Sequence, residues 1–116
     1  MSIKKINEIK AENVSAGIKT TKQVLISSDE APNFAMRKFS IEPGGSMPLH
    51  FNEVEHEQFV LRGSAEITIG NQKFIVQKND VVFIPANVKH DYKTLGDVPF
   101  EFLCVVPNKK DNITLV

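Results

Sequence analysis

Apolar and polar residues alternate along most of this chain, and a period of two is the pattern of half-buried β-strands. Turn residues interrupt the alternation every eight to twelve positions, which is typical of a β-sandwich or barrel. No window has the 3.6-residue period of an amphipathic helix. The predicted strands occupy 34–45, 57–70 (two strands broken at Gly63-Ser64), 72–85 (two strands broken at Asn79-Asp80) and 99–107.

The two ends of the chain carry weaker patterns. We predict a short first strand over 7–12, an irregular stretch over 11–17 and a loose tail over 108–116. There is no low-complexity tract and no linker, so the chain is expected to be a single all-β domain over 1–116. Residues 1–20 would then form an N-terminal strand or arm, and 34–107 the barrel.

Composition narrows the class of protein. The 14 basic and 14 acidic residues cancel, which removes the basic surface that nucleic-acid binding needs. No apolar run approaches the roughly 20 residues of a transmembrane helix, and the N-terminus lacks the apolar core of a signal peptide. A single cysteine excludes an internal disulfide framework. We therefore expect a cytoplasmic protein that binds neither nucleic acid nor membrane.

The three histidines of the chain, His50, His56 and His90, fall within a recurring pattern of spacing. From Gly44 to Gly63 the chain has the form G-x5-H-x-N-x3-H-x6-G. This resembles the first motif of the cupin superfamily, G-x5-H-x-H-x3-E-x6-G. Asn52 stands at the second histidine position of that motif, and His56 stands at its glutamate position.

The second cupin motif, G-x5-P-x-G-x2-H-x3-N, is matched without a gap by Asn79, Pro85, Asn87, His90 and Thr94. Asparagine replaces both glycines of the motif, and it is among the residues that best tolerate a positive φ. The resemblance covers 44–94 and implies a double-stranded β-helix, the jelly-roll barrel of cupins. More narrowly, the chain resembles small manganese-binding cupins with four histidines, from which it departs at Asn52.

Strand geometry explains how distant histidines would meet. His50 and Asn52 are two residues apart, so both point to one face of a strand. Residues 53–55 then turn the chain, so that His56 re-enters on the adjacent strand, and His90 comes from the second motif. The predicted metal ligands are therefore His50, Asn52, His56 and His90.

The expected cofactor is one divalent transition metal: Mn, Fe, Zn, Ni or Cu, with Mn or Fe favoured because an amide oxygen and waters suit them. Asn52 has two possible roles. Its oxygen ligates the metal, or the side chain stands back and hydrogen-bonds a metal-bound water, which leaves a coordination position open. The second role is slightly preferred, because an amide is a weak ligand.

Alternation also predicts the wall of a small-molecule pocket. Gln58 shares the inward face of His56, Phe102 and Cys104 share one face of the last strand, and Tyr92 lies two residues after His90. The opposite face carries Phe59 and Leu61. Two large apolar side chains on an outer face indicate a homodimer, which is common among small cupins.

The expected function is metal-dependent chemistry on a small organic molecule. The first hypothesis is an oxidoreductase of dioxygenase type, since three histidines with open positions let substrate and O2 bind one metal together. The alternative is a non-enzymatic module that binds or senses a small ligand through the metal, and the third is a structural metal site. No catalytic residue is assigned. An open coordination position facing a cavity would distinguish the first two from the third.

Overall fold

Ten β-strands and one short 3₁₀ helix make up the fold in a computed structural model that describes residues 1–116. All strand pairs are antiparallel. None of the helical structure is long or apolar enough to pass through a lipid bilayer. The elements are η1 (Ile6–Glu8), β1 (Glu12–Asn13), β2 (Ile18–Ile26), β3 (Phe34–Phe51), β4 (His56–Arg62), β5 (Ser64–Ile69), β6 (Gln72–Gln77), β7 (Val81–Ile84), β8 (His90–Leu95), β9 (Phe100–Pro107) and β10 (Thr114–Leu115).

The long strand β3 organises the molecule because it belongs to both halves of the sheet. Residues 34–41 pair with β9, whereas residues 46–50 pair with β8. Between these stretches lies Pro43-Gly44-Gly45, where Gly44 has φ of 80°. A side chain at Gly45 would lie 2.7 Å from the backbone oxygen of Ile18. Glycine thus allows the close approach that turns the corner.

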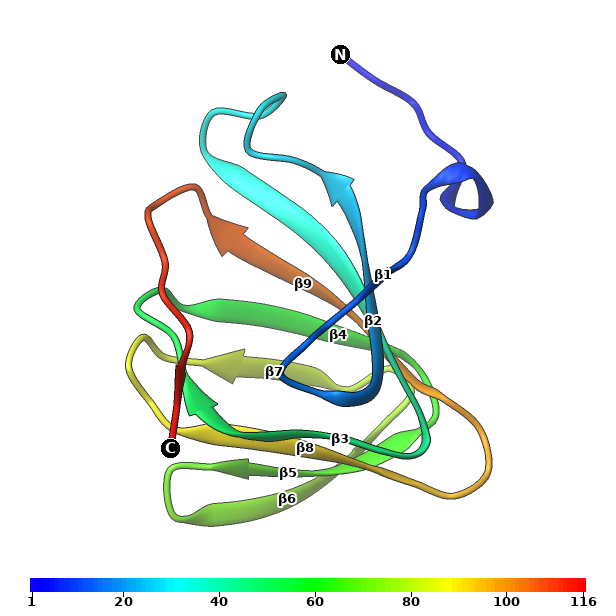
Figure 1. Cartoon of the computed structure of the whole chain (residues 1–116), viewed down its shortest axis with the longest axis vertical. Helices are drawn as coiled ribbons and strands as arrows, with labels where there is room; N and C mark the ends of the chain where they lie inside the picture. The colour runs from blue at the N-terminus through cyan, green and yellow to red at the C-terminus, as the bar shows by residue number, and fades with distance from the viewer.

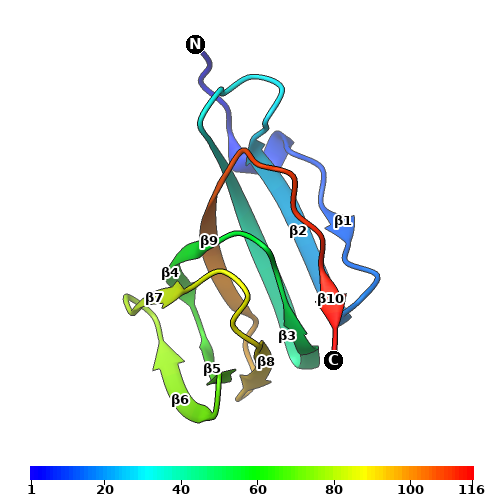
Figure 2. The same cartoon turned by 90° about the vertical axis from the view of Figure 1, so that its left-hand side faces the viewer.

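The sheet curls round β3. Its order is β6-β5-β8-β3-β9-β4-β7, with β2 and β10 also paired to β3. The strands β8, β5 and β6 lie on one side of β3, and β9, β4 and β7 lie on the other (Figure 1). In the view turned by 90° both sets lie to the left of β3, which shows the curl of the sheet (Figure 2). The predicted all-β jelly-roll domain is therefore confirmed. The predicted end of a strand at residue 45 is wrong, because the turn residues there bend the strand rather than stop it.

The turn residues expected between the other strands behave as predicted. Gly63 separates β4 from β5 with φ of 75°, and Asn79 precedes β7 with φ of 76°. Asn87, the other asparagine at a motif glycine position, has φ of 65°. Both asparagines therefore keep the left-handed backbone that glycine would supply.

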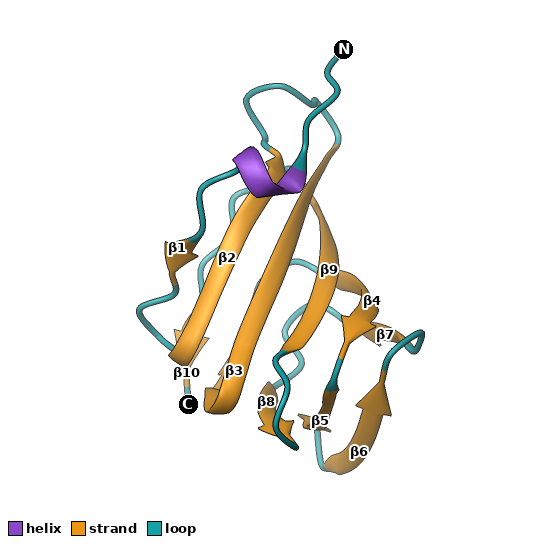
Figure 3. Cartoon of the chain, turned by 90° about the vertical axis from the view of Figure 1, so that its right-hand side faces the viewer, coloured by secondary structure: helices purple, strands orange, loops and turns teal.

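The two ends differ from the sequence expectation. Residues 6–8 form η1 instead of part of a first strand (Figure 3). Gln23 holds this turn through hydrogen bonds to the carbonyls of Ile6 (2.9 Å) and Ile9 (2.8 Å). The tail is not loose, because Leu115 pairs with His50 on β3. Contacts between residues far apart in the sequence determine both segments, so local patterns do not reveal them.

The interior has an apolar end and a polar end. Along β4 and β9 every second side chain points inward, as alternation predicts. Tyr92 and Phe102 stack at 5.2 Å between ring centroids, and Phe102 also stacks on Phe39 at 5.3 Å. Beyond these rings the inward-facing residues become polar, and the three histidines lie there. The buried apolar cluster is Ile41, Met47, Val60, Ala65, Ile67, Val82, Ile84, Tyr92, Phe100, Phe102 and Cys104.

Candidate metal centre

Three strands bring the three histidines together. His50 lies near the end of β3 and is the direct cross-strand partner of His90 at the start of β8, while His56 begins β4. The ring centroids of His50 and His90 are 4.2 Å apart, and those of His56 and His90 are 5.8 Å apart. All three side chains are buried, with exposed fractions of 4%, 7% and 1% for His50, His56 and His90. The structure thus places them side by side, as the motif spacing predicts.

Backbone carbonyls orient two of these imidazole rings. His50 Nδ1 lies 2.7 Å from the carbonyl oxygen of Pro48, and His90 Nδ1 lies 2.9 Å from that of Val88. A carbonyl only accepts hydrogen bonds, so each Nδ1 carries the proton and each Nε2 keeps its lone pair. The Nε2 atoms of His56 and His90 are buried without any hydrogen-bond partner. Such atoms are costly in an interior, and a metal ion is one partner that would satisfy them.

Burial also keeps the imidazoles neutral. Desolvation is the main cause that lowers the pKa of His56 to about 3, with the positive charge of Arg37 adding to it. Desolvation likewise lowers the pKa of His90 to about 4 and lowers the pKa of His50. Neutral imidazole is the form that binds metals. All three rings therefore have the ligating form at neutral pH.

Asn52 lies beside the histidines, and the C-terminal tail fixes its orientation. Its Nδ2 donates to Asp111 Oδ2 at 3.2 Å, while Asp111 Oδ1 accepts a hydrogen bond from the Glu53 backbone at 2.8 Å. Because a carboxylate accepts only, the amide nitrogen must face Asp111. Asn52 Oδ1 is then left buried without a partner. No local sequence pattern marks Asp111, which lies 59 residues from Asn52.

The donor set fits a divalent transition metal, since three imidazole nitrogens and an amide oxygen are ligands that such ions accept. The side chains as placed do not close on a single point, however. No group of three or more histidine, cysteine, aspartate or glutamate side chains is arranged to hold a metal ion. Side-chain rotation would therefore have to accompany metal binding.

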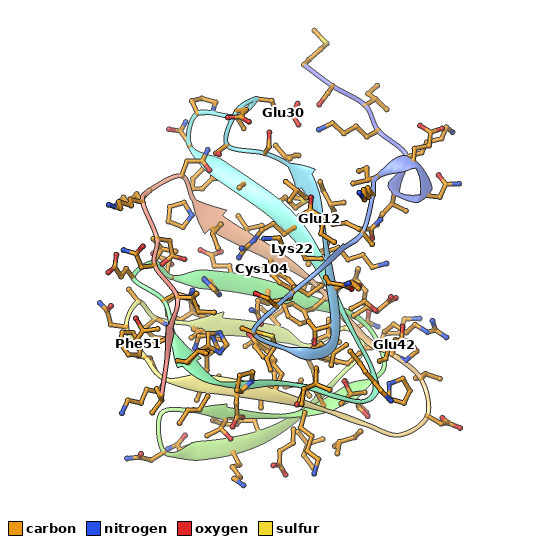
Figure 4. All side chains as sticks on the ribbon, in the orientation of Figure 1. Glu12, Lys22, Glu30, Glu42, Phe51 and Cys104 are labelled. Atoms are coloured by element: carbon orange, nitrogen blue, oxygen red, sulfur yellow. The ribbon has the colours of Figure 1, made fainter.

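A cavity of about 290 Å³ opens beside the histidines. Its wall also includes Lys22 of β2 and Arg37 of β3. The segments near the two ends of the chain contribute Val14 and Asp111. Figure 4 labels two residues of this lining, Lys22 on β2 and Cys104 on β9, which lie on either side of β3. The lining of the cavity includes every residue that was predicted for the site from the sequence: His50, Asn52, His56, Gln58, His90, Tyr92, Phe102 and Cys104.

The predicted pocket residues Gln58, Tyr92 and Cys104 form a buried polar group of their own. Gln58 Nε2 donates to the Tyr92 hydroxyl oxygen at 2.7 Å and lies 3.8 Å from Cys104 Sγ. Burial raises the pKa of Tyr92 far above its ordinary value. The phenol therefore keeps its proton at neutral pH and accepts a hydrogen bond from the amide.

Sequence reasoning missed Arg37, although a signal was present. Residues 37, 39 and 41 lie on one face of β3. Of these, Ile41 belongs to the core and Phe39 packs against it. A charged residue in such a series is unusual unless something pairs with it. The alternation of β3 was therefore sufficient to mark Arg37 as inward-facing.

Comparison with known families agrees with this architecture. The model of the family described as "Cupin domain" matches residues 37–106. The chain belongs to the cupin family. This confirms the wider of the two resemblances, whereas the narrower one, to manganese-binding cupins, stays a prediction.

Among solved structures, this cupin is similar to the polyketide cyclase RemF from Streptomyces resistomycificus. The two share 30% sequence identity with a TM-score of 0.92, and the match covers 100% of this chain and 85% of RemF. The cupin-2 domain Rru_A2000 from Rhodospirillum rubrum matches with a TM-score of 0.85 and 25% identity, over 99% of this chain and 80% of that one.

The curated relatives match this chain over only part of its length. This cupin is 30% identical over 76 residues to mannose-1-phosphate guanylyltransferase from Klebsiella pneumoniae, a match that covers 64% of this chain but 16% of that protein. The chain therefore spans a small part of the length of this relative. The activity named for it belongs to a much longer protein.

Proposed function

We propose that this cupin binds one divalent transition metal through His50, His56 and His90, and a small organic ligand in the adjacent cavity. The observation that carries the proposal is the pair of buried Nε2 atoms of His56 and His90 that have no hydrogen-bond partner. Three rings at one end of the barrel, all neutral at pH 7 and two held by carbonyls through Nδ1, form a donor set suited to such an ion. Manganese or iron is the preferred identity, as the sequence indicated.

The residues around the histidines have distinct tasks in this proposal. The carbonyls of Pro48 and Val88 hold the rings of His50 and His90 in one tautomer. Asp111 aims the amide oxygen of Asn52 away from itself, where it is free to ligate or to accept a hydrogen bond from water or ligand. When bound, the metal would supply Lewis-acid chemistry, or redox chemistry if it is iron or manganese.

The reaction that we propose first is oxygen-dependent and of dioxygenase type. The site offers few protein groups for acid–base work, since the Tyr92 phenol is bonded to Gln58 and keeps its proton. The metal would therefore carry most of the chemistry. The similar protein RemF is a polyketide cyclase, which supports a small organic substrate but not a particular reaction.

Ligand binding without turnover is the competing function. The observation that favours it is the same Gln58–Tyr92 pair, because mutually bonded side chains are suited to shaping a pocket rather than to moving protons. Zinc separates the two functions, since it has no redox chemistry. An oxygenase should lose turnover when zinc replaces iron or manganese, whereas a binding module should keep its ligand affinity within a few-fold. Oxygen uptake and ligand binding measured with both metals decide between them.

The metal content of untagged protein, prepared without chelators, tests the proposal itself. We expect close to one first-row metal per chain by mass spectrometry, and loss of most of it in His50→Ala, His56→Ala and His90→Ala. The matched control is Asn71→Ala, since Asn71 is an exposed turn residue outside the cavity. Histidine variants that retain as much metal as this control would refute the metal centre.

A further inference from the structure

Arg37 is a charged side chain that points into the cavity. On β3 it lies directly opposite Cys104 of β9, and Cys104 lies directly opposite Gln58 of β4. Residues paired in this way project from the same face of a sheet. Because Cys104 and Gln58 line the cavity, Arg37 projects there too, and it contributes to the wall.

The guanidinium has no counter-ion. Its carbon Cζ lies 5.0 Å from the centroid of the Phe39 ring, and Nη2 lies 3.4 Å from Cys104 Sγ. No carboxylate forms an ion pair with it, and its Nε is buried without a partner. Arginine stays protonated in proteins, so a positive charge faces the cavity uncompensated.

The next residue along β3, Lys38, differs from Arg37 because it has a counter-ion. Lys38 points away from the cavity and pairs with Glu101 at 3.5 Å. On the inner face a second cation, Lys22, lies opposite Phe39 and lines the cavity. The one carboxylate of the lining, Asp111, is already bonded to Asn52 and to the backbone of Glu53. The cavity therefore has an excess of positive charge before any metal is counted.

We propose that Arg37 binds the carboxylate of a planar, single-ring organic acid whose other end faces the histidines. This inference rests on the proposed function, for which it specifies the ligand class. The planar guanidinium forms paired, charge-assisted hydrogen bonds with a carboxylate. One such fork suits a monoanion, whereas phosphate sites normally add backbone N–H groups at a helix N-terminus or a glycine-rich loop, and none lines this cavity.

The wall beside Arg37 favours a flat ligand. Phe39 and Phe102 stack at an interplanar angle of 16°, and Phe102 and Tyr92 at 18°. Offset-stacked and edge-to-face pairs of aromatic rings are stabilised beyond what their buried area alone provides. The volume of about 290 Å³ lies at the small end of ligand cavities, which limits the ligand to a single ring.

Calorimetric titration with benzoate, benzamide and phenyl phosphate tests the inference on the parent protein alone. Benzamide matches benzoate in shape but lacks its charge, so we expect benzoate to bind about tenfold more tightly or better. Equal affinity for the two, or no detectable binding of benzoate, would overturn the proposal. Tighter binding of phenyl phosphate than of benzoate would overturn the carboxylate assignment.

Variants locate the effect. Arg37→Gln should weaken benzoate binding by about tenfold or more. The affinity of Arg37→Lys should lie between those of Arg37→Gln and the parent, because lysine keeps the charge but lacks the paired N–H groups of the guanidinium. Lys38→Gln should bind benzoate as the parent does. Benzoate binding that is equal in Arg37→Gln and Lys38→Gln would overturn the role of Arg37. Each titration is run with metal-free and metal-loaded protein. A dependence on Arg37 in protein that cannot be loaded with metal would support this inference while refuting the metal centre. No dependence on Arg37 in protein that does take up one metal would overturn this inference alone.

Discussion

At the scale of single residues, the orientation of a few atoms defines the candidate site. Two carbonyls fix which nitrogen of His50 and His90 is protonated, and one carboxylate fixes which end of the Asn52 amide faces the cavity. Each of these supporting groups lies outside the predicted ligand set. Such groups commonly change metal affinity by about 10- to 100-fold when they are removed.

Removal of the Asp111 carboxylate tests this directly. In Asp111→Ala the Asn52 amide loses its hydrogen-bond partner, so its oxygen is no longer aimed and the tail is no longer tied to Glu53. We expect metal affinity to fall by about tenfold, measured by competition with a chromophoric chelator. The control is Asp97→Ala, because Asp97 is exposed in the turn after β8 and does not line the cavity. Equal affinity in the two variants would show that Asp111 does not position the site.

At the scale of elements, alternation predicted what lies along a strand but not how strands bend or dock. The inward set of β4, His56, Gln58 and Val60, followed from parity because each neighbour points the opposite way. The continuation of β3 through Gly44 could not be predicted from alternation, since glycine and proline are found both where a strand ends and where a strand bends. Asp111 gave no signal either, because its contacts with Asn52 and Glu53 depend on where the tail docks.

The turn between β4 and β5 offers a test of the fold itself. Gly63 has φ of 75°, and a Cβ there would lie 2.3 Å from the Pro99 carbonyl oxygen. Gly70 has φ of 60° but nothing within 4 Å of its Cβ position. Gly70→Ala should therefore cost only the left-handed strain of about 1 kcal/mol, and Gly63→Ala about 2 kcal/mol more. Urea unfolding measures both, and equal losses would contradict the close approach at Gly63.

At the scale of the whole molecule, the buried histidines couple stability to pH in the metal-free protein. The pKa values of His56 and His90, about 3 and about 4, lie below the ordinary value of 6.5. As pH falls below 6.5 the unfolded chain therefore takes up protons that the folded chain does not, and stability decreases.

We expect the free energy of unfolding to drop by about 2 kcal/mol or more between pH 6.5 and pH 5, a range in which carboxylates of ordinary pKa titrate little. Urea unfolding at a series of pH values measures this drop, and His56→Gln should reduce it. A stability that stays constant over this range, or rises as the pH falls, would show that the imidazoles are not held neutral by burial.

The outer face of the β9-β4-β7 strands leads to the remaining expectation, a homodimer. Phe59 and Phe83 are 41% and 54% exposed on neighbouring strands, while Leu61 is partly buried. Exposed apolar surface of this kind is often an interface. Sedimentation at micromolar concentration should show a dimer that Phe59→Glu weakens, whereas Ile75→Glu on β6 should not. A parent protein that sediments as a monomer would contradict the predicted homodimer.

The most direct test of the metal centre uses the fact that the chain has three histidines. In protein labelled with ¹⁵N at histidine, NMR should show three imidazoles, neutral at pH 7, with the Nδ1 of His50 and His90 protonated. Titration with Zn²⁺ should shift the Nε2 signals of all three together and end at one equivalent, while those two Nδ1 protons are retained. Signals that stay unchanged at one equivalent, or that shift independently of one another, would contradict a single centre built from His50, His56 and His90.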